Sequence, residues 1–152
     1  MTRLALAAAA LAALAAPASA CPNWQAAPSF GQITLQAGFL PDPYVRNITA
    51  GGGYDLAGCF GANGWGGSVA SAPDFDLYWE GVSPALTIAV TSGADTVLLV
   101  NAPDGQWYWD DDTDGRNPVL TFANPQQGLY DIWIGHYGGG SGIPGQLIIT
   151  ER

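Results

Sequence analysis

Four aspartates occupy five positions in the stretch WYWDDDTDGRNP, residues 107–118. Asp110, Asp112, Asp114 and Gly115 match the pattern D-x-D-x-D-G, the first half of a calcium-binding loop. Alternate carboxylates in a tight turn converge on one point, and Ca²⁺ takes six to eight oxygen ligands. Without a cation the same carboxylates repel each other. The spacing therefore predicts a structural calcium ion in this loop.

The second half of a helical calcium loop is missing from this stretch. The position that carries a bidentate glutamate in an EF-hand is Thr121, and no helix is expected on either side. Further oxygen ligands would come from Asp104, Asp111, the backbone carbonyl of Arg116 or water. The alternative is a solvated acidic turn, in which aspartates cap backbone N–H groups.

Two tryptophans directly before the acidic run are candidates for a ligand platform. In a strand, Trp107 and Trp109 project from one face and Tyr108 from the other. Two exposed rings in a row could stack on a sugar. The alternative is that the rings fill a glycine-rich core, because aromatic residues suit half-buried sheet surfaces. For Trp79 and Trp133 we expect the core position.

Nucleophilic catalysis would depend on His136, the only histidine in the chain. A serine triad needs a base within hydrogen-bond reach of the nucleophile and an acid that orients the base. Ser141, the nearest serine in sequence, lies in a glycine-rich run that does not match G-x-S-x-G, because residue 143 is isoleucine. We therefore expect a strand that ends near His136, a hairpin loop after it, and no catalysis.

The elements that would position these residues are short strands. Apolar and polar residues alternate in short runs, Gly, Pro, Asn and Asp separate the runs, and no run after residue 20 has helical periodicity. The expected strands lie at residues 32–37, 74–79, 85–90, 96–101, 105–109, 118–122, 128–137 and 146–151. The pattern predicts a single all-β domain, an antiparallel two-sheet sandwich of the jelly-roll type.

Two stretches depart from simple alternation. Residues 96–101 are apolar at consecutive positions, which predicts a central strand that is covered on both faces. Residues 51–67 are rich in glycine, so we expect this segment, pinned by Cys59, to be the least regular part of the domain.

The first twenty residues have the form of a secretory signal peptide. Arg3 precedes an apolar run at residues 4–16, Pro17 breaks the run, and Ala-Ser-Ala at 18–20 is a small-residue cleavage site. The run is too short to span a bilayer. Cleavage would leave a mature domain at residues 21–152, secreted to the periplasm or the extracellular space.

Cys21 and Cys59 are the only cysteines, and an exported chain with two cysteines most simply pairs them. Such a disulfide would stabilise the fold by about 4 kcal/mol in the chain-entropy model. The alternative is a lipid on Cys21, which would leave Cys59 as an odd thiol. The position three residues before Cys21 is Ala18, where lipoproteins usually carry leucine.

The charge of the mature domain excludes several kinds of partner. Three arginines and no lysine remain after residue 20, against 13 acidic residues, which gives a net charge of −10. Such a surface repels phosphate backbones and anionic lipids, so nucleic acid and membrane surfaces are excluded as partners. No later stretch is long and apolar enough to insert into a membrane. A protein or a carbohydrate is the partner that we expect.

The second half of the chain resembles a known family of exported domains. Four motifs carry the likeness: D-x-x-L-x-V at residues 95–100, a Pro-Asp-Gly turn at 103–105, the acidic run at 110–114, and GLYDIWI at 128–134 after a turn that contains Pro125. Over about residues 73–151 they resemble the bacterial pre-peptidase C-terminal (PPC) domain. The resemblance implies a small secreted β-sandwich that accompanies exported peptidases, sometimes binds calcium and does not itself cleave.

The sequence thus predicts a secreted, non-catalytic accessory or binding module, stabilised by calcium and one disulfide. A carbohydrate-binding sandwich that uses Trp107 and Trp109 is the alternative, and solvent exposure of these rings separates the two. A small secreted serine peptidase is a third hypothesis, which would require a serine and a carboxylate within reach of His136.

Overall fold

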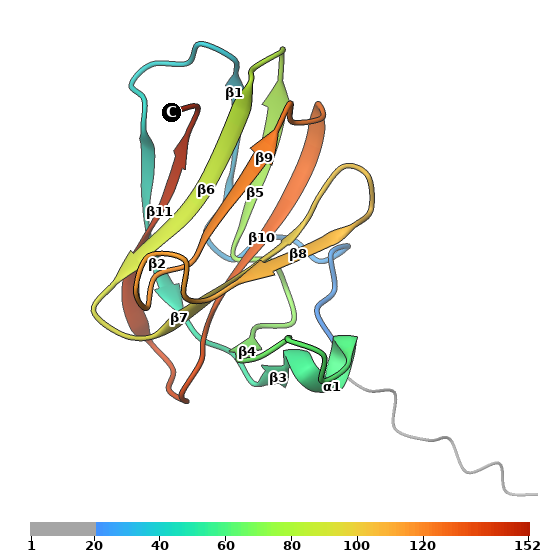
Figure 1. Ribbon diagram of the computed structural model, residues 1–152, viewed down its shortest axis with the longest axis vertical. Helices are drawn as coiled ribbons and strands as arrows, with labels where there is room; N and C mark the ends of the chain where they lie inside the picture. The colour runs from blue at the N-terminus through green and yellow to red at the C-terminus, as the bar shows by residue number, and fades with distance from the viewer. Residues whose placement is uncertain (1–20) are drawn as a thin grey trace, which may run out of the picture.

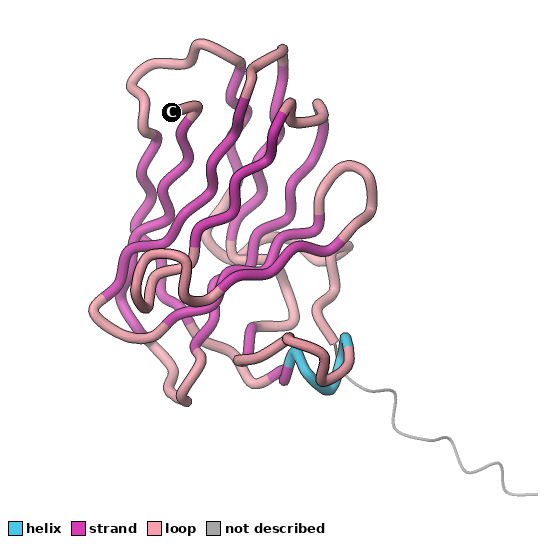
Figure 2. The backbone as a smooth tube through the Cα atoms, in the orientation of Figure 1, coloured by secondary structure: helices cyan, strands magenta, loops and turns pink. Residues whose placement is uncertain are grey.

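The chain folds into two stacked β-sheets, seen as two layers of strands in Figure 1 and, by type of element, in Figure 2. This computed structural model describes residues 21–152, and the expected signal peptide lies outside the described residues. The larger sheet contains β1 (Gln32–Gln36), β3 (Tyr54–Asp55), β4 (Ser68–Val69), β5 (Phe75–Glu80), β7 (Thr96–Asn101), β8 (Trp107–Asp110) and β10 (Gly128–His136). The smaller sheet contains β2 (Tyr44–Ala50), β6 (Ala85–Ser92), β9 (Val119–Ala123) and β11 (Ile143–Thr150). The predicted all-β sandwich is confirmed.

Strand β10 organises the larger sheet, because it pairs antiparallel with β5, β7 and β4. The smaller sheet has the order β2-β11-β6-β9, and all its pairs are antiparallel. One pair differs from the expected antiparallel pattern: β1 runs parallel to β5, with Gln32 opposite Asp76. The chain leaves β1 for β2 in the other sheet, so no hairpin joins β1 to β5 and none forces them to run antiparallel.

Alternation along the strands places the apolar side chains between the two sheets. On β5 the inward residues are Phe75, Leu77 and Trp79, and they join the buried side chains of β6, β7, β10 and β11 in one core. Strand β7 confirms the predicted central strand, because all six of its residues are buried. Its other face, with Val97 and Leu99, belongs to a second apolar cluster on the outer side of the larger sheet.

A short helix, α1 (Leu56–Phe60), corrects the expectation that no helix follows the signal peptide. The Asp55 carboxylate accepts a hydrogen bond from the Gly58 N–H at 2.9 Å and caps the helix, and Leu56 is buried in the second cluster. One turn is too short to show helical periodicity in the sequence. The rest of residues 51–67 contains only the two residues of β3, so the segment is nearly as irregular as predicted. Across residues 21–152, no helix has the length and apolar composition needed to cross a membrane.

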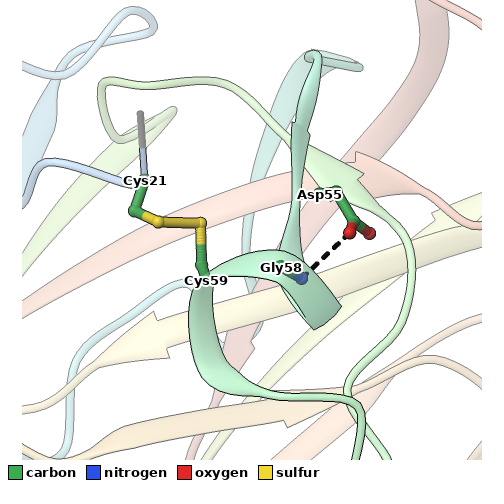
Figure 3. Close-up of a disulfide and its surroundings, with 4 residues drawn as sticks. All are labelled: Cys21, Asp55, Gly58 and Cys59. Atoms are coloured by element: carbon green, nitrogen blue, oxygen red, sulfur yellow. Dashed lines mark hydrogen bonds between the residues drawn. A yellow bond between two sulfur atoms is a disulfide. The ribbon is translucent and has the colours of Figure 1, made fainter. Parts of the chain in front are cut away.

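The predicted disulfide between Cys21 and Cys59 is confirmed (Figure 3). It joins the first described residue to α1 across 38 positions of sequence. The segment that contains α1 adds Phe60 and Trp65 to the second cluster, over the outer face of the larger sheet. The disulfide therefore links the 51–67 segment, which covers the second cluster, to the N-terminal segment at residues 21–31.

Candidate functional site

A cleft of about 520 Å³ opens on the outer face of the larger sheet, beside the loops that follow β7 and β9. Two indole rings, those of Trp24 and Trp107, line it together with the polar side chains of Asn101, Gln127 and Asp131. We call it the Trp24–Trp107 cleft. The N-terminal segment that contributes Trp24 is drawn in blue in Figure 1, near the loop between β7 and β8.

Sheet register explains why polar groups gather at this place. Asp76 on β5, Asp131 on β10, Asn101 on β7 and Trp107 on β8 are successive cross-strand partners. Directly opposed residues of neighbouring strands lie on the same face of a sheet. These four side chains, with Gln32 of β1 at the far end, therefore form one row across the outer face, and two acids stand at its middle.

Asp76 and Asp131 form a hydrogen-bonded carboxyl pair, and Asp131 lines the cleft. Only 5% of Asp76 and 3% of Asp131 is exposed. Two ionised carboxylates in contact repel each other strongly, so such a pair holds a shared proton. Burial, reinforced by the charge of Asp76, raises the pKa of Asp131 to about 7, and burial also raises the pKa of Asp76. One oxygen of each carboxyl, Oδ1, has no hydrogen-bond partner among the described residues.

A third buried acid, Asp74, has a structural role instead. Its Oδ2 accepts a hydrogen bond of 2.6 Å from the Ile134 N–H, and its own backbone N–H donates to the carbonyl of Ile132. Burial raises the pKa of Asp74 to about 7, although the bond from Ile134 opposes the shift. Asp74 thus fastens the start of β5 to the middle of β10, the two strands that carry the carboxyl pair.

Close packing of a loop against β10 shapes one edge of the cleft. Gly128 has φ 136° and lies against Pro103, so a Cβ at this position would approach the Pro103 Cβ to 2.9 Å. Glycine is therefore required here for both conformation and space. The contact holds the β7–β8 loop against the first residue of β10, where both segments line the cleft.

The two tryptophans of the predicted platform lie in different surroundings. They share the outer face of β8, as predicted, and Tyr108 packs against the sandwich core. Trp109 lies against Trp65, and its Nε1 donates to the Gly66 carbonyl at 2.9 Å. Its indole N–H is therefore already engaged beneath the 51–67 segment.

Trp107 has the position that a ligand could reach. Its ring centroid lies 5.1 Å from that of Phe60 and 5.2 Å from that of Trp133, which fix the ring in place. The ring is half-buried and borders the cleft. Trp133, like Trp79, is buried as the sequence predicted.

Trp24 supplies the second ring of the cleft, a role that was not predicted from the sequence. It is 52% exposed and follows two anchored residues, Cys21 in the disulfide and Asn23, whose N–H donates to the Ser71 carbonyl at 2.7 Å. A large aromatic residue in a polar stretch outside any expected strand was the available signal. Likewise, Asp76 and Asp131 are acids within strands that are otherwise apolar on both sides of them.

The acidic run folds into a tight turn that is held by its own hydrogen bonds. The Asp110 carboxylate accepts from the hydroxyl and the N–H of Thr113, at 2.9 and 3.3 Å, and from the Val119 N–H at 2.7 Å. The backbones of Asp114 and Asn117 exchange two further hydrogen bonds. Asp110 therefore caps backbone N–H groups of a turn. This is the role that we expected of it if the acidic run were a solvated turn without calcium.

The other predicted calcium ligands do not gather around Asp110. Asp104 accepts from the Gln106 N–H and the Tyr108 hydroxyl, at 2.9 and 3.0 Å. Burial and the charges of Asp112 and Asp110 raise the pKa of Asp111. Among residues 21–152, no three His, Cys, Asp or Glu side chains are grouped so that they could hold a metal ion. Calcium at Asp110, Asp112 and Asp114 stays a prediction from the sequence.

His136 ends β10, as predicted, and both its ring nitrogens contact the backbone. Nδ1 accepts from the Gly139 N–H at 3.0 Å, which assigns the ring proton to Nε2, 3.1 Å from the Gly52 carbonyl. In this tautomer neither nitrogen is available to take a proton from a serine hydroxyl. The histidine instead fastens the glycine-rich turn before β3 to the end of β10.

A second, smaller cleft of about 270 Å³ opens between the sheets. Its aromatic wall consists of Tyr108, Phe122 and Tyr130, which meet edge to face. The two tyrosine hydroxyls already donate to Asp104 and to the Gln126 carbonyl. The aromatic wall of this cleft therefore belongs to the sandwich core, and its hydroxyl groups are partnered.

Comparison with known proteins gives distant structural similarity and no match to a family. Neither a family model nor a curated protein matches the chain. Among solved structures, Aeromonas hydrophila PliG, a periplasmic lysozyme inhibitor of g-type lysozyme, aligns with 14% sequence identity and a TM-score of 0.39. The alignment covers 80% of this chain and 98% of PliG. A similarity at this level identifies neither a family nor a ligand for this chain.

Proposed function

We propose that this protein is an exported, non-catalytic carbohydrate-binding module, and that the Trp24–Trp107 cleft is its binding site. The observation that supports this most is the composition of the cleft, in which two indole rings face one opening together with carboxyl and amide side chains. A sugar ring has a face of C–H groups that packs on an indole and a rim of hydroxyls that hydrogen-bonds to carboxyl and amide groups. Concave sites with apolar walls and a few placed polar groups are typical of small-ligand binding.

Of the two partner classes that the sequence leaves open, protein and carbohydrate, the cleft favours carbohydrate. The apolar surface at this site is concave and interrupted by polar groups, whereas the core of a protein interface is depleted in charged residues. The signal sequence at residues 1–20 and the Cys21–Cys59 disulfide support export to an oxidising compartment. The resemblance of residues 73–151 to the PPC domain supports an accessory role beside exported enzymes, and we retain it as part of the proposal.

Binding fits the carboxyl pair better than hydrolysis does. Glycoside hydrolysis requires two carboxyl groups about 5 to 9.5 Å apart, on the two sides of the bond that is cleaved. Asp76 and Asp131 are in hydrogen-bond contact instead. Both nitrogens of His136, the other candidate acid–base group, contact the backbone.

The proposal is tested by isothermal titration calorimetry of the mature protein against soluble oligosaccharides. We expect Trp24→Ala to weaken binding roughly tenfold or more, a loss of about 1.4 kcal/mol, because the ring that packs on the sugar is removed. The matched control is Tyr137→Ala, which removes an aromatic ring of similar exposure, 51% against 52%, just beyond the opposite end of β10. Unchanged affinity in Trp24→Ala, or the absence of binding to any oligosaccharide, would contradict the proposal.

A further inference from the structure

We propose that the Trp24–Trp107 cleft selects sugars that carry a free, protonated amino group. This inference rests on the proposed carbohydrate-binding function and names the ligand class of that same site. The ligand would be a cationic amino sugar, such as the glucosamine units of a deacetylated polymer. Three features of the cleft support this selectivity: an unpartnered buried acceptor, an uncompensated negative charge and two indole rings in the lining.

The unpartnered acceptor belongs to the carboxyl pair. Asp131 lines the cleft with only 3% of its surface exposed, and its Oδ1 has no hydrogen-bond donor in the described protein. Oδ1 of Asp76, the cross-strand partner of Asp131, also has no hydrogen-bond partner, and it lies behind Asp131 rather than in the lining of the cleft. Buried polar groups are normally hydrogen-bonded, so the Asp131 oxygen indicates a place for a donor that the protein does not supply. An ammonium group offers three donors and no acceptor.

No cation of the described protein compensates the charge of the pair. None of the residues that line the cleft is basic. Two of the arginines are engaged elsewhere: Arg152 pairs with Asp42 at 3.2 Å, and Arg46 donates to the Phe30 carbonyl. The neighbours of the pair in the cross-sheet row, Gln32 and Asn101, are neutral. A cationic ligand would therefore supply a positive charge that the protein does not place beside Asp76 and Asp131. The negative charge of the pair would repel an anionic sugar.

The two indole rings add to the same preference. An ammonium group over the face of a tryptophan is attracted by the negative potential of the ring. An N-acetylated sugar has lost that charge and brings a carbonyl oxygen, which would face carboxyl oxygens that need donors. The order of affinity that follows is free amine, then neutral sugar, then anionic sugar.

A cation at the pair should also displace the proton that the two carboxyls share. A positive charge nearby favours the ionised form of a carboxyl, so binding of an amino sugar would release protons to the buffer. Binding of a neutral sugar would leave the shared proton in place. Proton release therefore gives a readout that does not depend on any variant.

The experiment compares two oligosaccharides of equal length and linkage, one of glucosamine and one of N-acetylglucosamine, by isothermal titration calorimetry. Each titration is run near pH 6.5 in two buffers that differ in ionisation enthalpy. We expect the glucosamine oligomer to bind about tenfold tighter or more, and only its binding enthalpy to depend on the buffer. Asp131→Asn keeps the shape of the side chain and should abolish both the preference and the buffer dependence. Affinity for the N-acetylated oligomer should change by less than about twofold.

The control variant is Glu80→Gln, which removes one negative charge from the same face of β5 outside the cleft. It should leave the preference unchanged, because screened surface charge contributes little at that distance. Equal affinity of the wild-type protein for the two oligomers, with no buffer dependence, would overturn the inference while sugar binding itself stood. Absence of binding by these and all other sugars would overturn the proposed function as well. If Asp131→Asn did not fold, the wild-type comparison in two buffers would still decide the question.

Discussion

At the scale of single residues, the unusual feature of this protein is that three carboxyl groups are buried on or next to one strand pair. Asp74, Asp76 and Asp131 are each at most 5% exposed, and each has a raised pKa. Only Asp74 has an evident structural function, as the acceptor for the Ile134 N–H. Burying the other two without a ligand is costly, which is typical of residues retained for a site.

These pKa values predict how stability depends on pH. The pKa values of Asp74 and Asp131 are about 7 in the folded protein, against 3.8 for an unperturbed aspartate, so the folded state binds protons more tightly between these limits. The stabilisation is full below about pH 4 and is lost as the pH rises through 7. We expect the free energy of unfolding in urea to fall by roughly 2 kcal/mol or more from pH 5 to pH 8. Asp131→Asn should reduce this slope to the part that Asp74 contributes, and Glu80→Gln should leave it unchanged, so an equal slope in wild type and Asp131→Asn would contradict the assignment.

Asp110 offers a second prediction for a single side chain. Because its carboxylate accepts from Thr113 and Val119, Asp110→Ala should destabilise the protein by about 1 to 2 kcal/mol, with or without calcium. Asp112 makes no such contact among the hydrogen bonds of the described protein, so Asp112→Asn should change the stability in EDTA by less than about 0.5 kcal/mol. Urea unfolding of the two variants in EDTA measures both effects. A larger loss in Asp112→Asn than in Asp110→Ala would mean that the turn is held in another way.

At the scale of elements, the sequence predicts the strands that have a clear apolar pattern, alternating or continuous, and misses those that lack one. Residues 96–101 coincide with β7, because six consecutive buried positions leave a clear pattern. β2 (Tyr44–Ala50) was missed, since only two of its seven side chains are buried and Arg46 and Asn47 lie at its centre. β3 and β4 are two residues long, too short for any period.

The candidate site could be predicted only in part, because it depends on register. Trp107 and Asp131 are 24 positions apart in sequence, and they meet only because β10 pairs with β7 and β7 with β8. The Trp24 ring reaches them through an N-terminal segment that no strand pattern identifies. The sequence predicted correctly that Trp107 and Trp109 share one face of their strand, but it could not show that a carboxyl pair would lie in the same row as Trp107.

The 51–67 segment is the element most dependent on the disulfide. It contains few strand residues, and Phe60 and Trp65 are its main contribution to the outer cluster. Replacing Cys21 and Cys59 together by serine should reduce the free energy of unfolding by about 2 to 4 kcal/mol. The fluorescence of the tryptophans in the second cluster should also shift to longer wavelength, because the 51–67 segment that covers them becomes mobile. A double variant with wild-type stability would show that the helix is held by packing alone.

At the scale of the whole molecule, a negative charge far from zero limits the range of ligands. The formal net charge of the full sequence is −9, and the sequence contains no lysine. Such a surface attracts cations and repels polyanions, and both effects weaken with added salt. Affinity for a cationic sugar should therefore fall as the salt concentration rises, whereas affinity for a neutral sugar should not.

Calcium binding by the acidic run is also tested through the stability of the whole molecule. We retain this binding as a proposal. A ligand that binds only the folded state adds about 2.7 kcal/mol of stability at a hundredfold excess over its dissociation constant. For a domain of this size that corresponds to a rise on the order of 10 °C in melting temperature. Melting curves in EDTA and in millimolar Ca²⁺ measure the effect, and Asp112→Asn should remove it. Coincident curves for the wild-type protein would show that the run is only a hydrogen-bonded turn.

The most direct test of the central claim, that the Trp24–Trp107 cleft binds sugar, is an NMR titration that follows the indole N–H signals. Six tryptophans give six such signals, and single replacements assign them. On addition of a binding oligosaccharide, we predict that the signals of Trp24 and Trp107 move together as the cleft fills. The signal of Trp79, buried in the sandwich core, should stay in place. Movement of other indoles while Trp24 and Trp107 stay fixed would contradict the account, as would the absence of any movement at saturating sugar.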